Sequence, residues 1–257
     1  MSKNETPASG PVYLYGIVAA GSVASLDAEG VAGKPLELIE HDDVAAVVSA
    51  FPATDFRVRR RDLIAHLRSI EHVFASTTIA PFPFGTVMLS AAAARDEILE
   101  PHAAQLRQLL ERLEGHVQMN VKGDYDEERV LREIVAHDPE VGRARERATA
   151  LGDAAYYENI RLGELVSARV AERRARDAAE IAARLGAVAA DFVTEPVDDG
   201  GVAVFKGSFL VGRDALGAFD EALDGLAEAS GHVRFEVTGP LPPVAFASLE
   251  PGVASWA

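Results

Sequence analysis

An acidic cluster is the most obvious candidate for chemistry in this sequence. The segment Asp124-Tyr125-Asp126-Glu127-Glu128 places carboxylates at its first, third and fifth positions, as a calcium-binding loop does. Such a loop also needs Gly at position 6 and Glu at position 12, where this chain has Arg129 and Val135. We therefore interpret the segment as the acidic start of a helix, where carboxylates stabilise the helix dipole.

Histidines are the other common metal ligands, and the chain has seven of them and no cysteine. None pairs with another at helical spacing beside a third ligand, and no His-Glu-x-x-His motif occurs. The sequence therefore predicts no metal site and no cofactor. The histidines are His41, His66, His72, His102, His116, His137 and His232.

The sequence also lacks motifs for nucleotide binding and for nucleophilic catalysis. The segment Gly30-Val31-Ala32-Gly33-Lys34-Pro35 is too short for a phosphate loop, and Pro35 occupies the place of the Ser or Thr that would hold magnesium. No Gly-x-Ser-x-Gly elbow is present. We predict no catalytic residue and no enzyme. A hydrolytic enzyme that uses acidic residues near Asp124 or Asp198 is the alternative.

The charge balance argues against polyanionic partners. The chain has 257 residues, with 40 Asp and Glu against 25 Lys and Arg, a formal net charge of −15. Such a chain repels nucleic acid and anionic membranes. Arg57, Arg59, Arg60 and Arg61 form the one dense basic patch of the first domain, at the start of an expected helix. Cations there oppose the helix dipole, which favours an acidic partner within this chain or on another protein.

The longest uncharged stretch, residues 73–94, is interrupted by Pro81, Pro83 and Gly85, so we expect no membrane insertion. A reducing cytoplasm is consistent with the lack of cysteines.

Hydrophobic patterns predict an α+β first domain over residues 11–115, after a disordered tail at 1–10. Residues 12–18 are typical of a strand, and residues 36–39 and 44–48 of a hairpin. Two helices are expected to follow, the second of which ends at Gly115. The first helix carries an apolar stripe that we expect to face the core, formed by Leu63, Ile64, Leu67, Ile70 and Phe74.

The second domain, residues 116–238, shows the element order βαββαβ of a modified ferredoxin-like fold with an enlarged helical crossover. The crossover should contain a long helix that begins near Gly152-Asp153 and reaches about residue 190. Residues 192–197 and 202–211 are expected to form strands joined at Asp198-Asp199-Gly200-Gly201. Residues 239–257 should form an extended tail that packs back on the first domain.

Four segments together resemble one family, the gas vesicle protein F/L family (GvpF/GvpL). Residues 13–18 are similar to its first strand, and residues 117–122 to the strand that opens its second domain. Its Pro-x-x-Phe-Gly-Thr-Val signature is matched by residues 80–87, and its Gly-Pro-x-Pro-Pro-x-x-Phe end motif by residues 239–246. The signature residues, which we also treat as candidate partner contacts, are Pro81, Phe82, Phe84, Gly85, Thr86, Gly239, Pro240, Pro242 and Pro243.

The resemblance implies a minor gas vesicle protein without catalytic activity. Its expected role is to bind the small hydrophobic shell protein, to limit the aggregation of that protein and to assist vesicle nucleation and assembly, together with other minor gas vesicle proteins. The expected location is the gas vesicle in the cytoplasm. The alternative within the same family is a structural subunit of the vesicle wall or of the nucleation complex.

Overall fold

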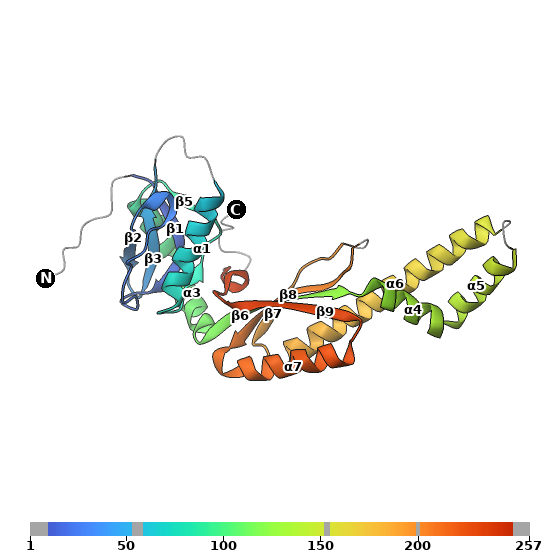
Figure 1. Ribbon diagram of the computed structural model, residues 1–257. Helices are drawn as coiled ribbons and strands as arrows, with labels where there is room; N and C mark the ends of the chain where they lie inside the picture. The colour runs from blue at the N-terminus through green and yellow to red at the C-terminus, as the bar shows by residue number, and fades with distance from the viewer. Residues whose placement is uncertain (1–9, 53–58, 152–154, 199–200, 249–257) are drawn as a thin grey trace. The chain divides into compact units, whose positions relative to one another are not determined.

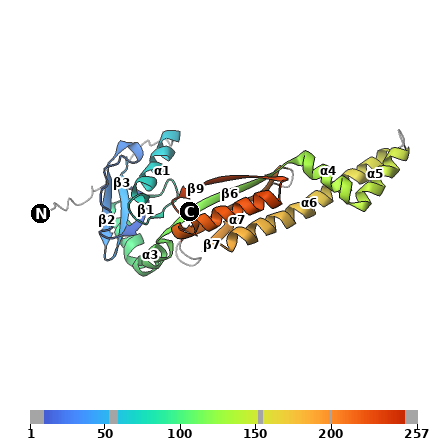
Figure 2. The ribbon, with the colours of Figure 1, turned by 60° about the horizontal axis from the view of Figure 1, so that its bottom comes forward.

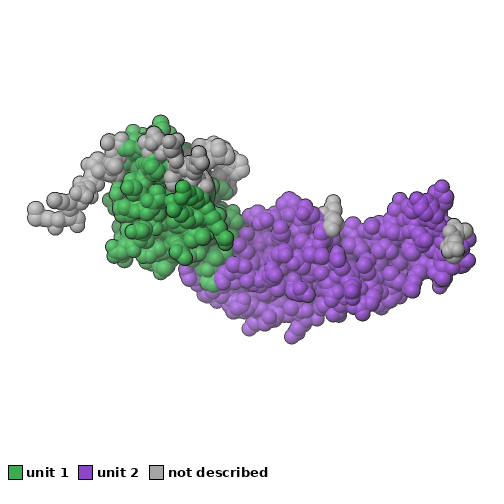
Figure 3. Space-filling view, turned by 45° about the horizontal axis from the view of Figure 1, so that its top comes forward, with its two compact units in different colours: residues 1–118, 240–257 green, residues 119–239 purple. Residues whose placement is uncertain are grey.

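The computed structural model describes residues 10–52, 59–151, 155–198 and 201–248. The chain forms two compact units, which Figure 3 shows in different colours. Unit 1 consists of residues 1–118 and 240–257, and unit 2 consists of residues 119–239. Unit 1 is thus assembled from two segments that are separated in the sequence. The expected tail at residues 1–10 falls, except for Gly10, outside the described residues, as do Arg57, Gly152-Asp153 and Asp199-Gly200.

Unit 1 is built on an antiparallel sheet with the strand order β2-β3-β1-β4, and β5 also pairs with β1. The long central strand β1 is almost entirely buried, on both faces of the sheet. The β2–β3 hairpin turns at Asp42, whose φ is +49°. The strands are β1 (Val12–Ala19), β2 (Leu36–His41), β3 (Val44–Ala50), β4 (Ala80–Pro81) and β5 (Val87–Met88).

Helices cover this sheet (Figure 1). Helix α1 and helix α3 both contact β1, and α3 also contacts β3 and β4. As the sequence predicts, α3 ends just before Gly115, whose φ of +71° is the left-handed conformation that stops a helix. The helical segments are η1 (Val31–Gly33), α1 (Arg60–Phe74), α2 (Ala91–Ala94), the π-helical η2 (Arg95–Leu99) and α3 (Glu100–Leu113).

The orientation of α1 differs from the prediction. Ile70 is buried and Phe74 half-buried, but Leu63, Ile64 and Leu67 are 41%, 39% and 45% exposed. The first three turns bury polar residues instead, namely Asp62, His66 and Ser69. The prediction of a core-facing apolar stripe was therefore wrong for Leu63, Ile64 and Leu67. The spacing of apolar residues does not show whether the polar side chains of the same helix have hydrogen-bond partners that allow them to be buried.

Unit 2 contains a four-stranded sheet with the order β7-β8-β6-β9. Strands β7 and β8 form an antiparallel pair, with Asp191 opposite Leu210 and Thr194 opposite Gly207. The protein is thus a mixed α/β chain with two sheets, as predicted, and the element order is compatible with the expected ferredoxin-like arrangement. The strands are β6 (His116–Tyr125), β7 (Asp191–Thr194), β8 (Ala203–Gly212) and β9 (Val233–Leu241).

The helices α6 and α7 pack along one side of this sheet, as Figures 1 and 2 show. Helix α6 has 31 residues, which corresponds to about 47 Å. Its first half extends beyond the sheet, where α4 and α5 pack against it. The helical segments are α4 (Glu127–His137), α5 (Pro139–Leu151), α6 (Tyr156–Gly186), η4 (Arg213–Ala215) and α7 (Leu216–Ala229), and η5 (Val244–Phe246) follows β9.

The acidic segment at residues 124–128 begins a helix, as predicted. Asp126 is the N-cap of α4, and its carboxylate accepts a hydrogen bond from the backbone N–H of Arg129 at 3.1 Å. Glu127 and Glu128 lie in the first turn, where they stabilise the helix dipole.

Candidate functional site

The signature segment, residues 80–87, lies along the central strand of unit 1. The short strand β4 pairs with β1 at Gly16 and Ile17, and the N–H of Phe82 donates to the Tyr15 carbonyl oxygen at 2.9 Å. At the other end of the segment, the Leu14 N–H donates to the Thr86 carbonyl oxygen at 2.9 Å. The segment is therefore fixed to β1 at both of its ends.

A chain of hydrogen bonds connects this segment to β1 and α1. The Gly85 N–H donates to the Tyr13 hydroxyl oxygen at 2.8 Å. The same hydroxyl lies 3.1 Å from His66 Nδ1, and it donates its hydrogen to that nitrogen when the neutral imidazole carries its proton on Nε2. His66 also forms a hydrogen bond with the Phe82 backbone. We call this the Tyr13–His66 chain.

Burial keeps the Tyr13–His66 chain uncharged at neutral pH. The His66 side chain is 3% exposed, and desolvation lowers its pKa from 6.5 to about 4, although the hydrogen bond with the Phe82 backbone raises it. Desolvation likewise raises the Tyr13 pKa to about 12. A neutral imidazole that is hydrogen-bonded within the fold positions the signature segment and is poorly placed for acid–base chemistry.

A second buried tyrosine, Tyr15, lies beside Tyr13, with their ring centroids 5.0 Å apart. The Tyr15 hydroxyl lies 2.9 Å from Ser49 Oγ and accepts a hydrogen bond from the Val31 N–H at 2.7 Å. Desolvation raises the Tyr15 pKa. A Cβ atom at Gly30 would lie 2.0 Å from this hydroxyl, so only glycine fits there. Tyr13 and Tyr15 thus connect loops of unit 1 to its central strand.

The predicted signature residues differ in exposure. Pro81 and Phe82 are buried, and Phe84 is half-buried with its ring 5.5 Å from the His66 ring in an edge-on arrangement. Gly85 is exposed, and its φ of +93° allows the turn that aims its N–H at Tyr13. The Thr86 hydroxyl donates to the Pro83 carbonyl oxygen at 2.8 Å and closes the turn.

The C-terminal motif meets the signature segment within unit 1. The turn η5 contacts β4, and the Ala245 N–H donates to Gln118 Oε1 at 2.8 Å. The motif is extended only as far as Leu241, where β9 ends. Among its predicted residues, Gly239 and Pro240 are exposed, whereas Pro242 and Pro243 are buried.

Unit 2 has a different kind of polar cluster, made of ion pairs between helices. Arg173 on α6 reaches Glu133 on α4 at 2.7 Å, and Arg169 reaches Asp138 at 2.8 Å. Hydrogen bonds from Arg173 and Arg129 lower the Glu133 pKa. These contacts attach α4 and the start of α5 to the long helix.

Asp177 on α6 connects the same helix to the sheet of unit 2. Its Oδ2 accepts a hydrogen bond from the Tyr125 hydroxyl at 2.8 Å and lies 2.8 Å from His232 Nε2. Desolvation, together with the hydrogen bond to Asp177, raises the Tyr125 pKa.

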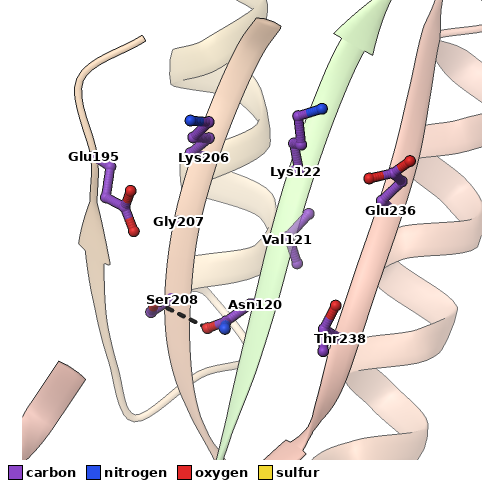
Figure 4. A pocket seen from close by; sticks show the side chains of 9 residues that line it. All are labelled: Asn120, Val121, Lys122, Glu195, Lys206, Gly207, Ser208, Glu236 and Thr238. Atoms are coloured by element: carbon purple, nitrogen blue, oxygen red, sulfur yellow. Dashed lines mark hydrogen bonds between the residues drawn. The ribbon is translucent and has the colours of Figure 1, made fainter. Parts of the chain in front are cut away.

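The side of the unit 2 sheet shown in Figure 4 bears a polar pocket of about 210 Å³. Ser208 Oγ donates to Asn120 Oδ1 at 2.9 Å in this pocket, and Lys122 pairs with Asp124 nearby. The pocket is lined by Asn120, Val121, Lys122, Glu195, Lys206, Gly207, Ser208, Glu236 and Thr238. Neither Asp124 nor Asp198, the acidic residues of the enzyme alternative, belongs to this lining.

Among the residues that the structure describes, no three His, Asp or Glu side chains lie close enough together to hold a metal ion. Within the same part of the chain, no helix has the length and apolar character to cross a membrane.

The fold is that of solved gas vesicle proteins. The crystal structure of the gas vesicle protein GvpF from Anabaena sp. PCC7120 matches 95% of this chain and all of its own chain, with a TM-score of 0.82 and 20% identity. The crystal structure of GvpF from Microcystis aeruginosa matches 94% of this chain and all of its own, with a TM-score of 0.73 and 22% identity.

Sequence comparison gives the family directly. The family model described as gas vesicle synthesis protein GvpL/GvpF matches residues 11–248. Gas vesicle protein F from Streptomyces sp. (strain CB03234) is 35% identical over 240 residues, which are 91% of this chain and 98% of the relative. This chain belongs to the GvpL/GvpF family of gas vesicle synthesis proteins, and its role is associated with gas vesicles.

Proposed function

We propose that this protein is an assembly factor that binds the hydrophobic gas vesicle shell protein in the cytoplasm and limits its aggregation during vesicle nucleation. The family assignment supports a gas vesicle role. The observation that carries the proposal is the presence of clustered, exposed apolar side chains on a chain with a net charge of −15. Exposed apolar clusters mark interaction surfaces, and high net charge keeps a complex in solution.

Two such clusters lie on helices. The first is formed by Leu63, Ile64 and Leu67 on α1. The second lies at the end of α5 and the start of α6. It includes Tyr156 and Tyr157, which are 69% and 77% exposed and whose ring centroids are 5.3 Å apart. Leu151 and Ile160 are also exposed there. We call these surfaces the α1 face and the helix-tip cluster.

The signature residues support the same role through architecture. Phe82 and Pro81 are buried, and Gly85 contributes to the Tyr13–His66 chain, which holds α1 in place. We propose that these residues shape unit 1, while exposed residues of the same unit contact the partner. Such a function requires no catalytic group.

A co-expression experiment tests the proposal. The shell protein is produced with and without this chain, and its aggregation is followed by light scattering, with affinity capture to detect a complex. Capture of the shell protein together with reduced scattering supports the proposal. If the two proteins do not associate and scattering is unchanged, the proposal is wrong. Retention of this chain at fixed stoichiometry on washed vesicles would instead favour a structural subunit of the wall.

A further inference from the structure

The α1 face is held outward by the buried contacts on the opposite side of the helix. The Asp62 carboxylate accepts a hydrogen bond from the Arg59 N–H at 2.8 Å, which satisfies a backbone donor at the start of the helix. One turn later, His66 joins the Tyr13–His66 chain, and Ser69 Oγ donates to the Ala65 carbonyl oxygen at 2.9 Å. Rotating α1 to bury its leucines would break the contacts of His66 with Tyr13 on β1 and with the Phe82 backbone.

The exposed side chains form one continuous surface. Leu63 and Leu67 are separated by four residues, so they lie one above the other, with Ile64 beside them. All three are at least 39% exposed. An apolar strip of this width on a helix matches the apolar side of a second helix, which packs against it with its own side chains.

Arginines border the strip on the side of Ile64. Arg60 and Arg68 lie four residues before and four residues after Ile64, and both are exposed. Neither guanidinium makes an ion pair with any residue in the described part of the chain. Glu71, four residues after Leu67, is the one exposed acidic residue on α1. The border is therefore basic, on a chain that is otherwise strongly acidic.

We infer that the α1 face docks an amphipathic helix of a second protein whose apolar side is bordered by Asp or Glu. The partner's apolar side covers Leu63, Ile64 and Leu67, and its carboxylates pair with Arg60 and Arg68. Charge complementarity selects this partner over helices of similar hydrophobicity, because a lysine-bordered helix would place like charges beside the arginines. This inference concerns the surface and the chemistry of its partner, and it holds for any protein that supplies the helix.

Two designed peptides test the inference with the full chain. Both have the same leucine face and length, one with a glutamate border and the other with a lysine border. Binding is followed by fluorescence anisotropy of the labelled peptides. We expect the glutamate-bordered peptide to bind at least about tenfold more tightly, a difference that grows at low salt. Equal affinities, or no binding of either peptide, would overturn the inference.

Variants locate the binding surface. Leu67→Ser should lower the affinity for the glutamate-bordered peptide about tenfold. The double variant Arg60→Glu with Arg68→Glu should bind the lysine-bordered peptide more tightly than the glutamate-bordered one. The matched control is Tyr156→Ser with Tyr157→Ser in the helix-tip cluster, which should leave binding unchanged. Because all these side chains are exposed, circular dichroism should show folded variants. Loss of binding in the control alone would place the site on unit 2 and contradict the inference.

Two other occupants give distinct results that would also overturn it. A second copy of this chain on the α1 face would appear as a dimer in sedimentation velocity that Leu67→Ser converts to monomer. If residues 249–257 of the same chain occupied the α1 face, the peptides would bind detectably only to a variant that lacks those residues.

Discussion

The Tyr13–His66 chain of unit 1 and the Arg173–Glu133 pair of unit 2 are stabilised in opposite ways. In unit 1, Tyr13 and His66 are buried, uncharged and joined by hydrogen bonds. In unit 2, Arg173 and Glu133 are charged and partly exposed. Because the Tyr13–His66 chain is buried, its contribution to stability depends on close packing and on the protonation state of His66. The contribution of the Arg173–Glu133 pair depends on Coulomb attraction, which salt screens. The two units should therefore respond to different perturbations.

The largest effect should come from Phe82→Ala, which removes a buried ring beside the Tyr13–His66 chain. Loss of a buried Phe ring costs about 3–5 kcal/mol of unfolding free energy. Urea unfolding followed by circular dichroism measures the loss. The half-buried Phe84 provides the control, and Phe84→Ala should cost less. Unchanged stability in Phe82→Ala would show that this ring does not support the unit.

Acid should destabilise unit 1 through His66. Above about pH 6.5 the imidazole is neutral in both the folded and the unfolded chain, so its contribution is complete. As the pH falls towards 4, the unfolded chain binds a proton that the folded chain does not, and stability drops by about 3 kcal/mol.

Urea unfolding from pH 7 to pH 4 measures this loss. In His66→Gln the drop should be smaller by about that amount, whereas His72→Gln on the same helix should keep it. An identical pH dependence in wild type and His66→Gln would rule out His66 as the acid-sensitive group.

The stability of unit 2 should depend on salt concentration through its ion pairs. Arg173→Ala removes the hydrogen bond to Glu133 and should cost about 1–2 kcal/mol at low salt, because charged hydrogen bonds are the stronger ones but these side chains are partly exposed. The cost should shrink in 1 M NaCl. Hydrogen exchange of α4 and α6 measures it locally.

The smallest effect is expected for Arg184→Ala. Its guanidinium lies 3.3 Å from Glu180, and both side chains are about half exposed, so the loss should stay below about 0.5 kcal/mol. A cost as large as that of Arg173→Ala would show that burial does not separate the two pairs.

Much of the fold could be predicted from local patterns. The apolar runs at residues 12–18 and 44–48 indicated β1 and β3, and Gly115 marked the end of α3, because these signals depend on neighbouring residues alone. Helix α5 was not predicted as a helix. Its sequence is rich in Arg and Ala and buries only Val141, Ala144 and Ala148, so its apolar periodicity is weak.

The candidate site could be predicted only in part. Family resemblance pointed to residues 80–87 and 239–246, and the structure places β4 in contact with η5. Sequence spacing did not show that His66 would be buried, because its partner Tyr13 lies 53 residues away. The exposed α1 face follows from the same long-range contact and was missed for the same reason.

The interruption of unit 1 in the sequence has a consequence for synthesis on the ribosome. Residues 119–239 are translated before residues 240–248, so the part of the chain that emerges first is completed last. The Gln118 side chain receives the Ala245 N–H from 127 residues further along. A nascent or C-terminally truncated protein that lacks residues 240–248 therefore displays β4 without η5, and these two elements can come into contact only after residues 244–246 have been translated.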